Sequence, residues 1–378
     1  MKNIVILGAG TGGLVTANSL GSALGRQARI TVIEKKNAHT FAPSLLWLAV
    51  GKRRPDQITR TLKHIKGAEL LNTSVTSVDW PNRLIKTVDR TVPYDYLILA
   101  PGAAHCPEKL PGFANAALDL YSVEGAARIQ SELASFKGGR VVILVSSLPY
   151  KCPAAPYEAS FLIDAYLRQS NIKAQIQIVT PEALPMPSAG PEIGKGVEQM
   201  LSDRKIEYTP NQNAISIEAS SRKIRTHSGA ELSYDLLVGI PPHGLPAFLS
   251  GSPILAENGW VKVNPQTLET SIPDVFAIGD VTTIALKNGK PLPKAGVFAH
   301  AEAEIVAANL ADRILGKRGQ REFLGHGACF LETGYGRAGY ATGAFFAEPA
   351  PKVIMKPPSR FSHFVKVIFE KWWLWKWF

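Results

Sequence analysis

The residues best suited to chemistry are three cysteines, Cys106, Cys152 and Cys329, each within two residues of a proline or a glycine. Cys152 follows an apolar run over residues 141–145 and the turn Ser146-Ser147-Leu148-Pro149, and a helix-like pattern comes after it. A strand, a turn and a helix in this order bind a dinucleotide when glycines in the turn admit the pyrophosphate. Here a thiol stands in place of those glycines. The pattern indicates a nucleotide unit that has exchanged its ligand for a reactive cysteine.

An intact dinucleotide-binding loop opens the chain. An apolar run over residues 3–7 leads into Gly8-Ala9-Gly10-Thr11-Gly12-Gly13, which matches G-x-G-x-x-G and precedes a helical pattern. Gly8 permits the tight turn, Gly10 admits a pyrophosphate and Gly13 allows close packing of the helix. A second apolar run ends at Glu34, whose carboxylate can accept hydrogen bonds from a ribose.

Two later segments indicate that the dinucleotide is FAD. The strand pattern that ends in Ala100-Pro101-Gly102 and the segment Ile272–Asp280 resemble those of flavoprotein reductases with two dinucleotide domains, in which the aspartate equivalent to Asp280 binds the ribityl chain. After it, Lys294-Ala295-Gly296 opens a helical pattern that we expect to reach about Leu310. The positive end of that helix would stabilise negative charge on a reduced flavin.

Taken as a whole, residues 1–378 resemble the sulfide:quinone oxidoreductases and their relatives, the flavoprotein subunits of flavocytochrome c sulfide dehydrogenases. The motifs that carry this resemblance are Gly8-Ala9-Gly10, Lys151-Cys152-Pro153-Ala154-Ala155-Pro156-Tyr157-Glu158, Ala277-Ile278-Gly279-Asp280, Lys294-Ala295-Gly296 and Phe369-Glu370-Lys371-Trp372-Trp373-Leu374-Trp375-Lys376. The resemblance implies an enzyme with FAD as its cofactor, sulfide as the electron donor and a membrane quinone as the acceptor.

For the cysteines, the resemblance implies that Cys152 and Cys329 form a redox-active bridge beside the flavin. Hydrosulfide would attack one sulfur of the bridge and release the other as a thiolate, which passes two electrons to the flavin while sulfane sulfur or polysulfide collects. Lys151, if it points inward, would lower the pKa of the thiol. The role of Cys106 stays open between a sulfur-relay thiol and a turn residue without a role, and His105 is a candidate proton acceptor.

Three other interpretations remain. Type II NADH:quinone dehydrogenases share the FAD motifs, but they need a second glycine loop where this chain has Ser146-Ser147-Leu148-Pro149. A flavocytochrome-type subunit would pass its electrons to a cytochrome. A flavin-containing sensor without turnover would require Cys152 and Cys329 to lie too far apart to cooperate, as separately buried small residues. We expect no metal site, because the histidines show no metal-ligand spacing.

The C-terminal segment 361–378 is rich in tryptophan and phenylalanine, with lysines between them. Together with a net charge of 42 − 31 = +11, it predicts an anchor in the headgroup region of a membrane rather than a nucleic-acid site. The lysines at positions 366, 371 and 376 do not share one helical face, so we do not expect a clean amphipathic helix. The alternative is a helix docked into its own core or into a dimer interface, and homo-oligomerisation stays open. No stretch is long enough to span a bilayer, and the start of the chain lacks an export signal, which predicts the cytoplasmic face of the membrane.

In the resembling family the same region holds the quinone, on the flavin face opposite the cysteines. By this resemblance Phe330, Phe361 and Trp372 would stack on the quinone ring, and Lys294 would lie near the flavin and quinone carbonyls. The expected architecture is α/β, with two Rossmann-like dinucleotide-binding domains and a C-terminal membrane-associating region. Its parts are the FAD domain over 1–105 and 240–318, a second Rossmann-like domain over 106–239 with Cys152, and a C-terminal region over 319–378.

Overall fold

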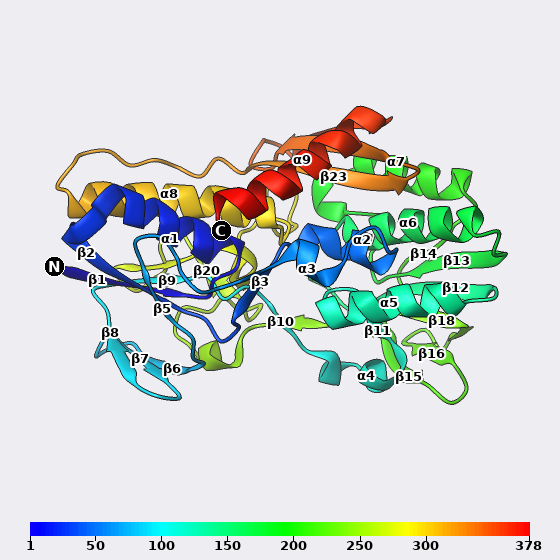
Figure 1. The fold of residues 1–378 in the computed structure, drawn as a ribbon, viewed down its shortest axis with the longest axis horizontal. Coiled ribbons are helices and arrows are strands. Elements are labelled where there is room, and N and C mark those ends of the chain that lie inside the picture. The colour runs from blue at the N-terminus through cyan, green and yellow to red at the C-terminus, as the bar shows by residue number, and fades with distance from the viewer.

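The computed structural model describes residues 1–378 and consists of two α/β halves side by side, with helix α9 lying across both (Figure 1). The first half is built on a parallel five-stranded sheet in the order β21-β9-β1-β2-β5. Its strands are β1 (Lys2–Leu7), β2 (Ala28–Ile33), β5 (Glu69–Leu71), β9 (Tyr96–Leu99) and β21 (Val275–Ala277). Helices α1 (Thr11–Leu24) and α8 (Gly296–Ile314) pack side by side over this sheet. The predicted helix after Lys294 therefore extends four residues further than expected.

The second half repeats this plan with the strand order β11-β18-β12-β13-β14, again all parallel. Its strands are β11 (Leu118–Asp119), β12 (Gly139–Val145), β13 (Ala174–Val179), β14 (Glu207–Thr209) and β18 (Leu236–Ile240), and its helices are α5 (Val123–Ser135), α6 (Ala155–Gln169) and α7 (Pro191–Asp203). Residues 141–145 are fully buried, as expected for a parallel strand covered on both faces. The prediction of an α/β fold with two dinucleotide-type units is confirmed.

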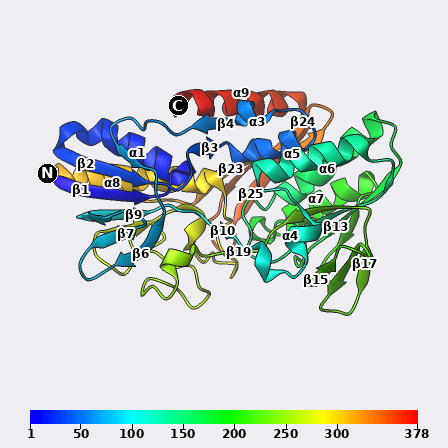
Figure 2. The ribbon, with the colours of Figure 1, turned by 60° about the horizontal axis from the view of Figure 1, so that its bottom comes forward.

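Each half also carries a three-stranded antiparallel sheet below its main sheet (Figure 2). These are β6 (Val75–Asp79), β7 (Leu84–Thr87) and β8 (Thr91–Pro93) in the first half, and β15 (Ala214–Glu218), β16 (Lys223–Thr226) and β17 (Glu231–Ser233) in the second. Short elements complete the halves: α2 (Leu45–Ala49), α3 (Pro55–Ile58), α4 (Phe113–Ala116), β3 (Ala38–Thr40), β4 (Thr59–Thr61), β20 (Val261–Lys262) and β22 (Thr282–Thr283). The chain crosses between the halves along β10 (Ala104–His105) and β19 (His243–Gly244), which pair antiparallel.

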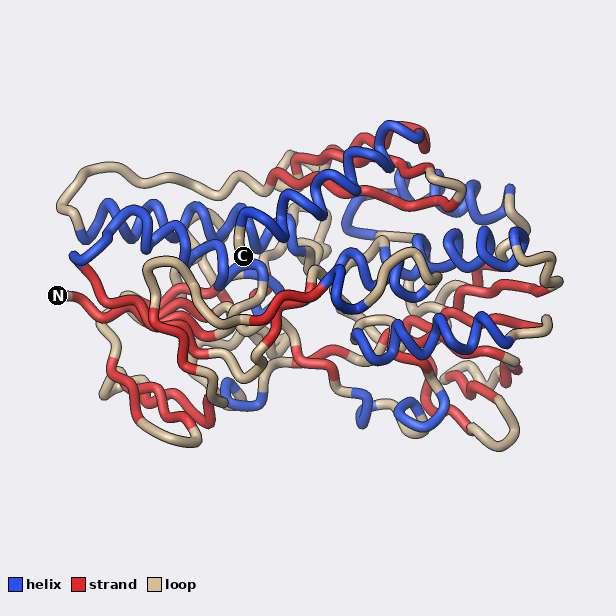
Figure 3. The backbone as a smooth tube through the Cα atoms, in the orientation of Figure 1, coloured by secondary structure: helices blue, strands red, loops and turns tan.

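The C-terminal part consists of the antiparallel sheet β23 (His326–Gly334), β24 (Arg337–Ala344) and β25 (Lys352–Ser359), followed by α9 (Arg360–Lys376). Strand β23 packs on α6, and α9 then runs back from the second half toward the first (Figure 3). The Ser359 side chain caps α9 by accepting a hydrogen bond from the N–H of Ser362 at 3.0 Å. Its far end packs on the first half, where Trp373 lies against Phe41 with ring centroids 6.1 Å apart.

Helix α9 places Lys366 and Glu370 inward beside Trp373 and Leu374, and it presents an apolar stripe outward. Lys366 and Glu370 are buried, and Glu370 receives hydrogen bonds from Arg53 and from the Ser44 hydroxyl. The outward stripe follows helical spacing and consists of Phe361, Phe364, Ile368, Trp372 and Trp375. The three lysines do not share one face, as expected, because Lys366 is buried while Lys371 and Lys376 are exposed. None of the helices combines the length and the apolarity needed to span a bilayer.

Candidate active site

The glycine loop after β1 has two positions fixed by packing and one that is open. A Cβ at Gly8 would lie 2.4 Å from the carbonyl oxygen of Ala100, and one at Gly13 would lie 1.9 Å from that of Gly8. Gly8 also has a φ of +98°, a conformation that favours glycine. A Cβ at Gly10 would meet no atom within 4 Å. Gly10 therefore leaves room for a ligand to approach the backbone, as predicted for a pyrophosphate.

The amino ends of α1 and α8 meet beside this loop. A Cβ at Gly296, the first residue of α8, would lie 3.7 Å from the Thr11 hydroxyl at the start of α1. Two positive helix ends thus face one region and favour a negatively charged ligand. The Glu34 carboxylate accepts the N–H of Ala9 at 2.8 Å and that of Lys36 at 2.9 Å. A carboxylate has about four acceptor positions, so Glu34 can still bind a ribose.

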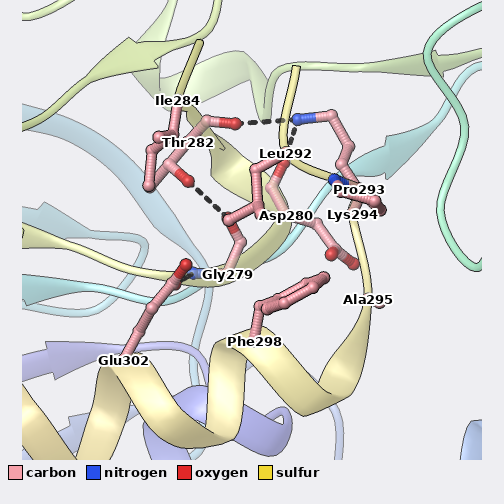
Figure 4. Close-up of a pocket in the computed structure, with 10 residues that line it drawn as sticks. All are labelled: Gly279, Asp280, Thr282, Ile284, Leu292, Pro293, Lys294, Ala295, Phe298 and Glu302. Carbon is pink, nitrogen blue, oxygen red and sulfur yellow. Dashed lines mark hydrogen bonds between the residues drawn. The ribbon is translucent and has the colours of Figure 1, made fainter. Parts of the chain in front are cut away.

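Asp280 lies in a small pocket after β21 (Figure 4). Its carboxylate points away from the ammonium of Lys294 and toward Ala295 and the ring of Phe298, and its Oδ1 atom is buried without a hydrogen-bond partner. Burial raises the pKa of Asp280, while nearby Lys151 and Lys294 lower it. An unpaired buried acceptor is costly, so it implies a ligand with hydroxyl donors.

Lys294 is held in place by the main chain around Asp280. Its ammonium donates to the carbonyl oxygens of Asp280 at 2.7 Å and Thr282 at 2.9 Å, and it lies 3.5 Å from the centroid of the Trp260 ring. Burial lowers the pKa of Lys294 to about 8. The predicted contact of Lys294 with flavin and quinone carbonyls stays a prediction, because its three donors already have these partners.

The predicted cofactor residues converge from four strands and two helices, since Glu34 follows β2. Gly8 and Gly10 follow β1, Ala100 and Gly102 follow β9, Gly279 and Asp280 follow β21, and Ala295 caps α8. The open backbone at Gly10 and the paired helix ends suit the pyrophosphate of FAD. The carboxylate of Asp280, which has no partner on Oδ1, suits its polyol. The residues present therefore fit this cofactor.

The Cys152 loop is tied directly to the Lys294 segment. The N–H of Cys152 donates to the carbonyl oxygen of Lys294 at 2.6 Å, and the Tyr121 hydroxyl donates to that of Lys151 at 2.5 Å. Cys152 has a φ of +53°, an uncommon conformation for a residue with a side chain, with a cost on the order of 1 kcal/mol. The surrounding hydrogen bonds hold the thiol in this geometry next to the predicted cofactor residues.

The structure brings Cys329 near enough to Cys152 for its charge to raise the pKa of Cys152, and both carry free thiols. Burial raises the pKa of Cys152 well above its usual range; Cys329 and Glu158 raise it further and Lys366 lowers it. Solvent reaches Cys329, but the protein atoms around it raise its pKa to about 11. The disulfide between them stays a prediction. Lys366 favours the Cys152 thiolate, and Lys151 does so too, because the charge of Cys152 raises the pKa of Lys151.

A buried charged network that the sequence analysis did not identify lies beside both thiols. Lys366 from α9 donates to the Glu158 carboxylate at 2.8 Å, and Glu158 also accepts the N–H of Glu332 at 2.7 Å. His363 lies 2.9 Å from a carboxylate oxygen of Glu332 through its Nδ1 atom. Burial lowers the pKa of Lys366, but Glu158 and Glu332 more than offset it, so that the pKa is raised. Lys366 therefore remains charged, as a stabilising partner for a thiolate requires.

Cys106 lies apart from this network. It is buried, and a Cβ on Gly244 would lie 2.8 Å from its sulfur. Burial raises its pKa, and neither of the other cysteines affects it. His105 instead packs on His243, with ring centroids 5.1 Å apart, and burial lowers the pKa of His105 to about 2. His105 is thus neutral, and its lowered pKa disfavours the predicted role as a proton acceptor; the roles of both residues stay predictions.

The predicted quinone-stacking residues do not lie together. Phe330 contacts Tyr340, with ring centroids 5.0 Å apart, whereas Phe361 is 74% exposed at the start of α9. Trp372, which stacks on Phe369, lies eleven residues after Phe361, and this separation is a rise of about 16 Å along a helix. Phe361 and Trp372 therefore cannot contact the same ring, and at most one of them belongs to a quinone slot.

The model of the pyridine nucleotide-disulphide oxidoreductase family matches residues 2–303. This chain belongs to that family. It is 25% identical over 366 residues to the mitochondrial sulfide:quinone oxidoreductase of Mus musculus, which covers 92% of this chain and 79% of the relative. It is also 25% identical over 359 residues to the type II NADH:quinone oxidoreductase of Haemophilus influenzae, with 82% and 80% covered.

The crystal structure of the sulfide:quinone oxidoreductase from Aquifex aeolicus shares the fold of this family member. It superposes with a TM-score of 0.88 over 100% of this chain and 91% of that one, at 23% identity. The resemblance predicted from the motifs is thereby confirmed.

The glycine loop gives a direct test of the cofactor site. Gly10→Ala should fold normally but bind FAD at least about tenfold more weakly, because the new methyl group points into space left for the ligand. Gly13→Ala should instead lower the melting temperature, since its methyl group meets the Gly8 carbonyl. FAD content by absorbance and thermal melts measure both effects. The control is Gly196→Ala in α7, which also meets no atom within 4 Å. FAD binding by Gly10→Ala at wild-type affinity would contradict the assignment.

Proposed function

We propose that this chain is an FAD-dependent sulfide:quinone oxidoreductase that converts sulfide to sulfane sulfur or polysulfide and reduces a membrane quinone. The observation that carries the proposal is the neighbouring pair of thiols, Cys152 and Cys329, beside the predicted cofactor residues. A dinucleotide unit with a thiol in place of its glycine loop suits a sulfur substrate. The mouse and Aquifex aeolicus proteins, both named for this activity, support the same substrate and acceptor.

The chain's own residues perform the sulfur chemistry. In the oxidised enzyme, Cys152 and Cys329 share a disulfide; hydrosulfide attacks one sulfur, the S–S bond breaks, and a persulfide and a thiolate result. Lys366 stabilises the thiolate by its charge, and Glu158 and Glu332 keep Lys366 protonated. Bound FAD would accept two electrons and release them to the quinone. The persulfide then loses its outer sulfur to a further hydrosulfide as a polysulfide, which leaves two thiols. These re-form the disulfide by giving up two protons, and the two electrons are those that FAD would accept.

The relative from Haemophilus influenzae makes type II NADH:quinone oxidoreduction the alternative. The second unit argues against it. Between β12 and α6 the loop has serines, prolines and Cys152, and it has no glycine to admit a pyrophosphate. A pyridine nucleotide would therefore bind poorly at the place where this fold normally holds it.

The outward stripe of α9 supports attachment to a membrane surface. Phe361 is 74% exposed and Trp375 78% exposed, and Lys376 lies 4.6 Å from the ring centroids of Trp372 and Trp377. Aromatic rings with lysines alongside suit the headgroup region, and a net charge of +11 favours acidic lipid. The proposal is a peripheral protein whose α9 lies in the plane of the interface, where a long-chain quinone is available.

Substitution of the cysteines tests the reaction. Cys152→Ser and Cys329→Ser should each bind FAD yet lose sulfide-dependent flavin reduction by about 10³-fold or more, because both the electrophilic sulfur and the leaving group are removed. Cys106→Ser is the matched control and should cost far less, since its thiol lies apart from the pair. Anaerobic stopped-flow absorbance measures the rates. Near-normal turnover of Cys329→Ser would exclude Cys329 from the mechanism.

Membrane attachment is best tested by point substitutions, because deletion of residues 372–378 would remove the buried Trp373 and Leu374 from the core. Phe361→Ser/Phe364→Ser/Trp375→Ser should weaken binding to acidic liposomes by about two orders of magnitude, at about 1 kcal/mol or more per side chain. Val88→Ser/Ile215→Ser removes exposed apolar side chains distant from α9 and should leave binding unchanged. Liposome sedimentation measures binding. If the triple variant sediments with acidic liposomes as fully as the wild type, the stripe makes a contact other than one with the membrane.

A further inference from the structure

Glu182 is a buried acid near the end of β13, the strand of the second unit that corresponds to the one before Glu34. In the first unit β1 pairs with β2, and Glu34 follows β2 and accepts a hydrogen bond from the glycine loop. In the second unit β12 pairs with β13 in the same parallel way, and Glu182 follows β13. Glu34 is the first residue after β2 and Glu182 the third after β13, so the two carboxylates lie at the same ends of comparable strands but not at the same position. Glu182, however, is only 2% exposed and faces tyrosines.

The Glu182 carboxylate holds the Cys152 loop from both sides. The hydroxyl of Tyr150, two residues before Cys152, donates to Oε2 of Glu182 at 3.0 Å. The hydroxyl of Tyr157, five residues after Cys152 in α6, donates to the same oxygen. Tyr208 contacts Glu182 only through its main-chain carbonyl, at 3.4 Å. One buried oxygen atom therefore fixes the two ends of the segment that carries the thiol.

Tyr150 transmits this contact to the cysteine. Its hydroxyl also lies 3.2 Å from the carbonyl oxygen of Pro153, the residue after Cys152. A hydroxyl has one proton, so Tyr150 cannot donate to both oxygens at once. Its contact with the Glu182 carboxylate therefore determines where the Tyr150 hydroxyl lies relative to the Pro153 carbonyl. Cys152 itself has a φ of +53° and keeps this conformation only while its surroundings hold it. Loss of the Glu182 contact would let the loop relax.

We propose that Glu182, an acid near the end of β13 in a unit without a phosphate-binding loop, is a positioning residue for Cys152. Its effect on turnover rests on the proposed function, because Cys152 is the thiol that reacts with sulfide there. Its effect on the reactivity of the Cys152 thiol does not rest on the proposed function. Burial raises the pKa of Glu182 to about 7, and hydrogen bonds from Tyr157, Tyr150 and Thr180 lower it, consistent with a carboxyl group committed to these partners.

The test compares Glu182→Leu, which removes the acceptor, with Glu182→Gln, which keeps a neutral one. In a Cys106→Ser/Cys329→Ser background Cys152 is the only thiol, and Glu182→Leu should speed its alkylation by iodoacetamide about tenfold because the buried thiol is released. In the chain with all three cysteines, the same change should slow sulfide-dependent flavin reduction about tenfold. Glu182→Gln should lie close to the wild type in both. These opposite changes separate misplacement of the thiol from a general loss of activity.

The control is Tyr94→Phe in the first half, which removes a buried tyrosine hydroxyl without a hydrogen-bond partner and should leave both rates unchanged. Alkylation of Cys329 in a Cys106→Ser/Cys152→Ser background should not respond to Glu182→Leu. Wild-type alkylation and flavin reduction in Glu182→Leu, or equal acceleration at both cysteines, would overturn the proposal. If Glu182→Leu does not fold, Tyr150→Phe must show the same opposite changes, and their absence would overturn it equally. If alkylation responds while sulfide fails to reduce even the wild-type flavin, the positioning role stands and the proposed function is wrong.

Discussion

The ion pair between Lys366 and Glu158 is the contact on which the arrangement of the two thiols depends. Both side chains are buried, and Nζ of Lys366 lies 2.8 Å from Oε1 of Glu158. Glu158 also accepts the N–H of Glu332. Removing one partner of such a pair leaves an uncompensated charge, at a cost of about 3–5 kcal/mol, so α6, β23 and α9 are held together. Glu158 lies six residues after Cys152, and Glu332 three residues after Cys329. The same contact that docks the C-terminal helix therefore brings the cysteines to one place.

This use of α9 also explains its outward face. A helix that turns its lysine and glutamate toward the protein has mainly apolar residues left for solvent, and exposed apolar patches of this kind mark an interaction surface. In the proposed enzyme one helix thus serves both sides of the reaction. Its inner face supplies the charge that stabilises a thiolate, and its outer face keeps the protein at the membrane where the quinone is. The two halves below it share one fold, but a glycine loop opens the first to a dinucleotide and a cysteine loop closes the second.

Local patterns in the sequence predicted the parts of the site that lie next to each other along the chain. The glycine loop, Asp280, the start of α8 and the Cys152 motif were all found because each follows a strand or begins a helix. The charged network was missed because Lys366 and Glu158 are 208 residues apart and no local pattern joins them. A lysine within an aromatic segment was the available signal, and it was interpreted as solvent-exposed. Glu182 was missed because two residues separate it from β13 and a proline-rich loop follows. The domain limits near 105, 239 and 318 stay predictions.

The most direct test of the account is the choice of electron donor. Purified holoprotein is mixed anaerobically with sulfide or with NADH at equal micromolar concentrations while the flavin absorbance is followed, and a quinone is then added. The account predicts that sulfide bleaches the flavin rapidly, that NADH does so poorly because the second unit has no pyrophosphate loop, and that the quinone restores the colour. Rapid bleaching by NADH, with little or none by sulfide, would contradict it and would identify the chain as an NADH:quinone oxidoreductase.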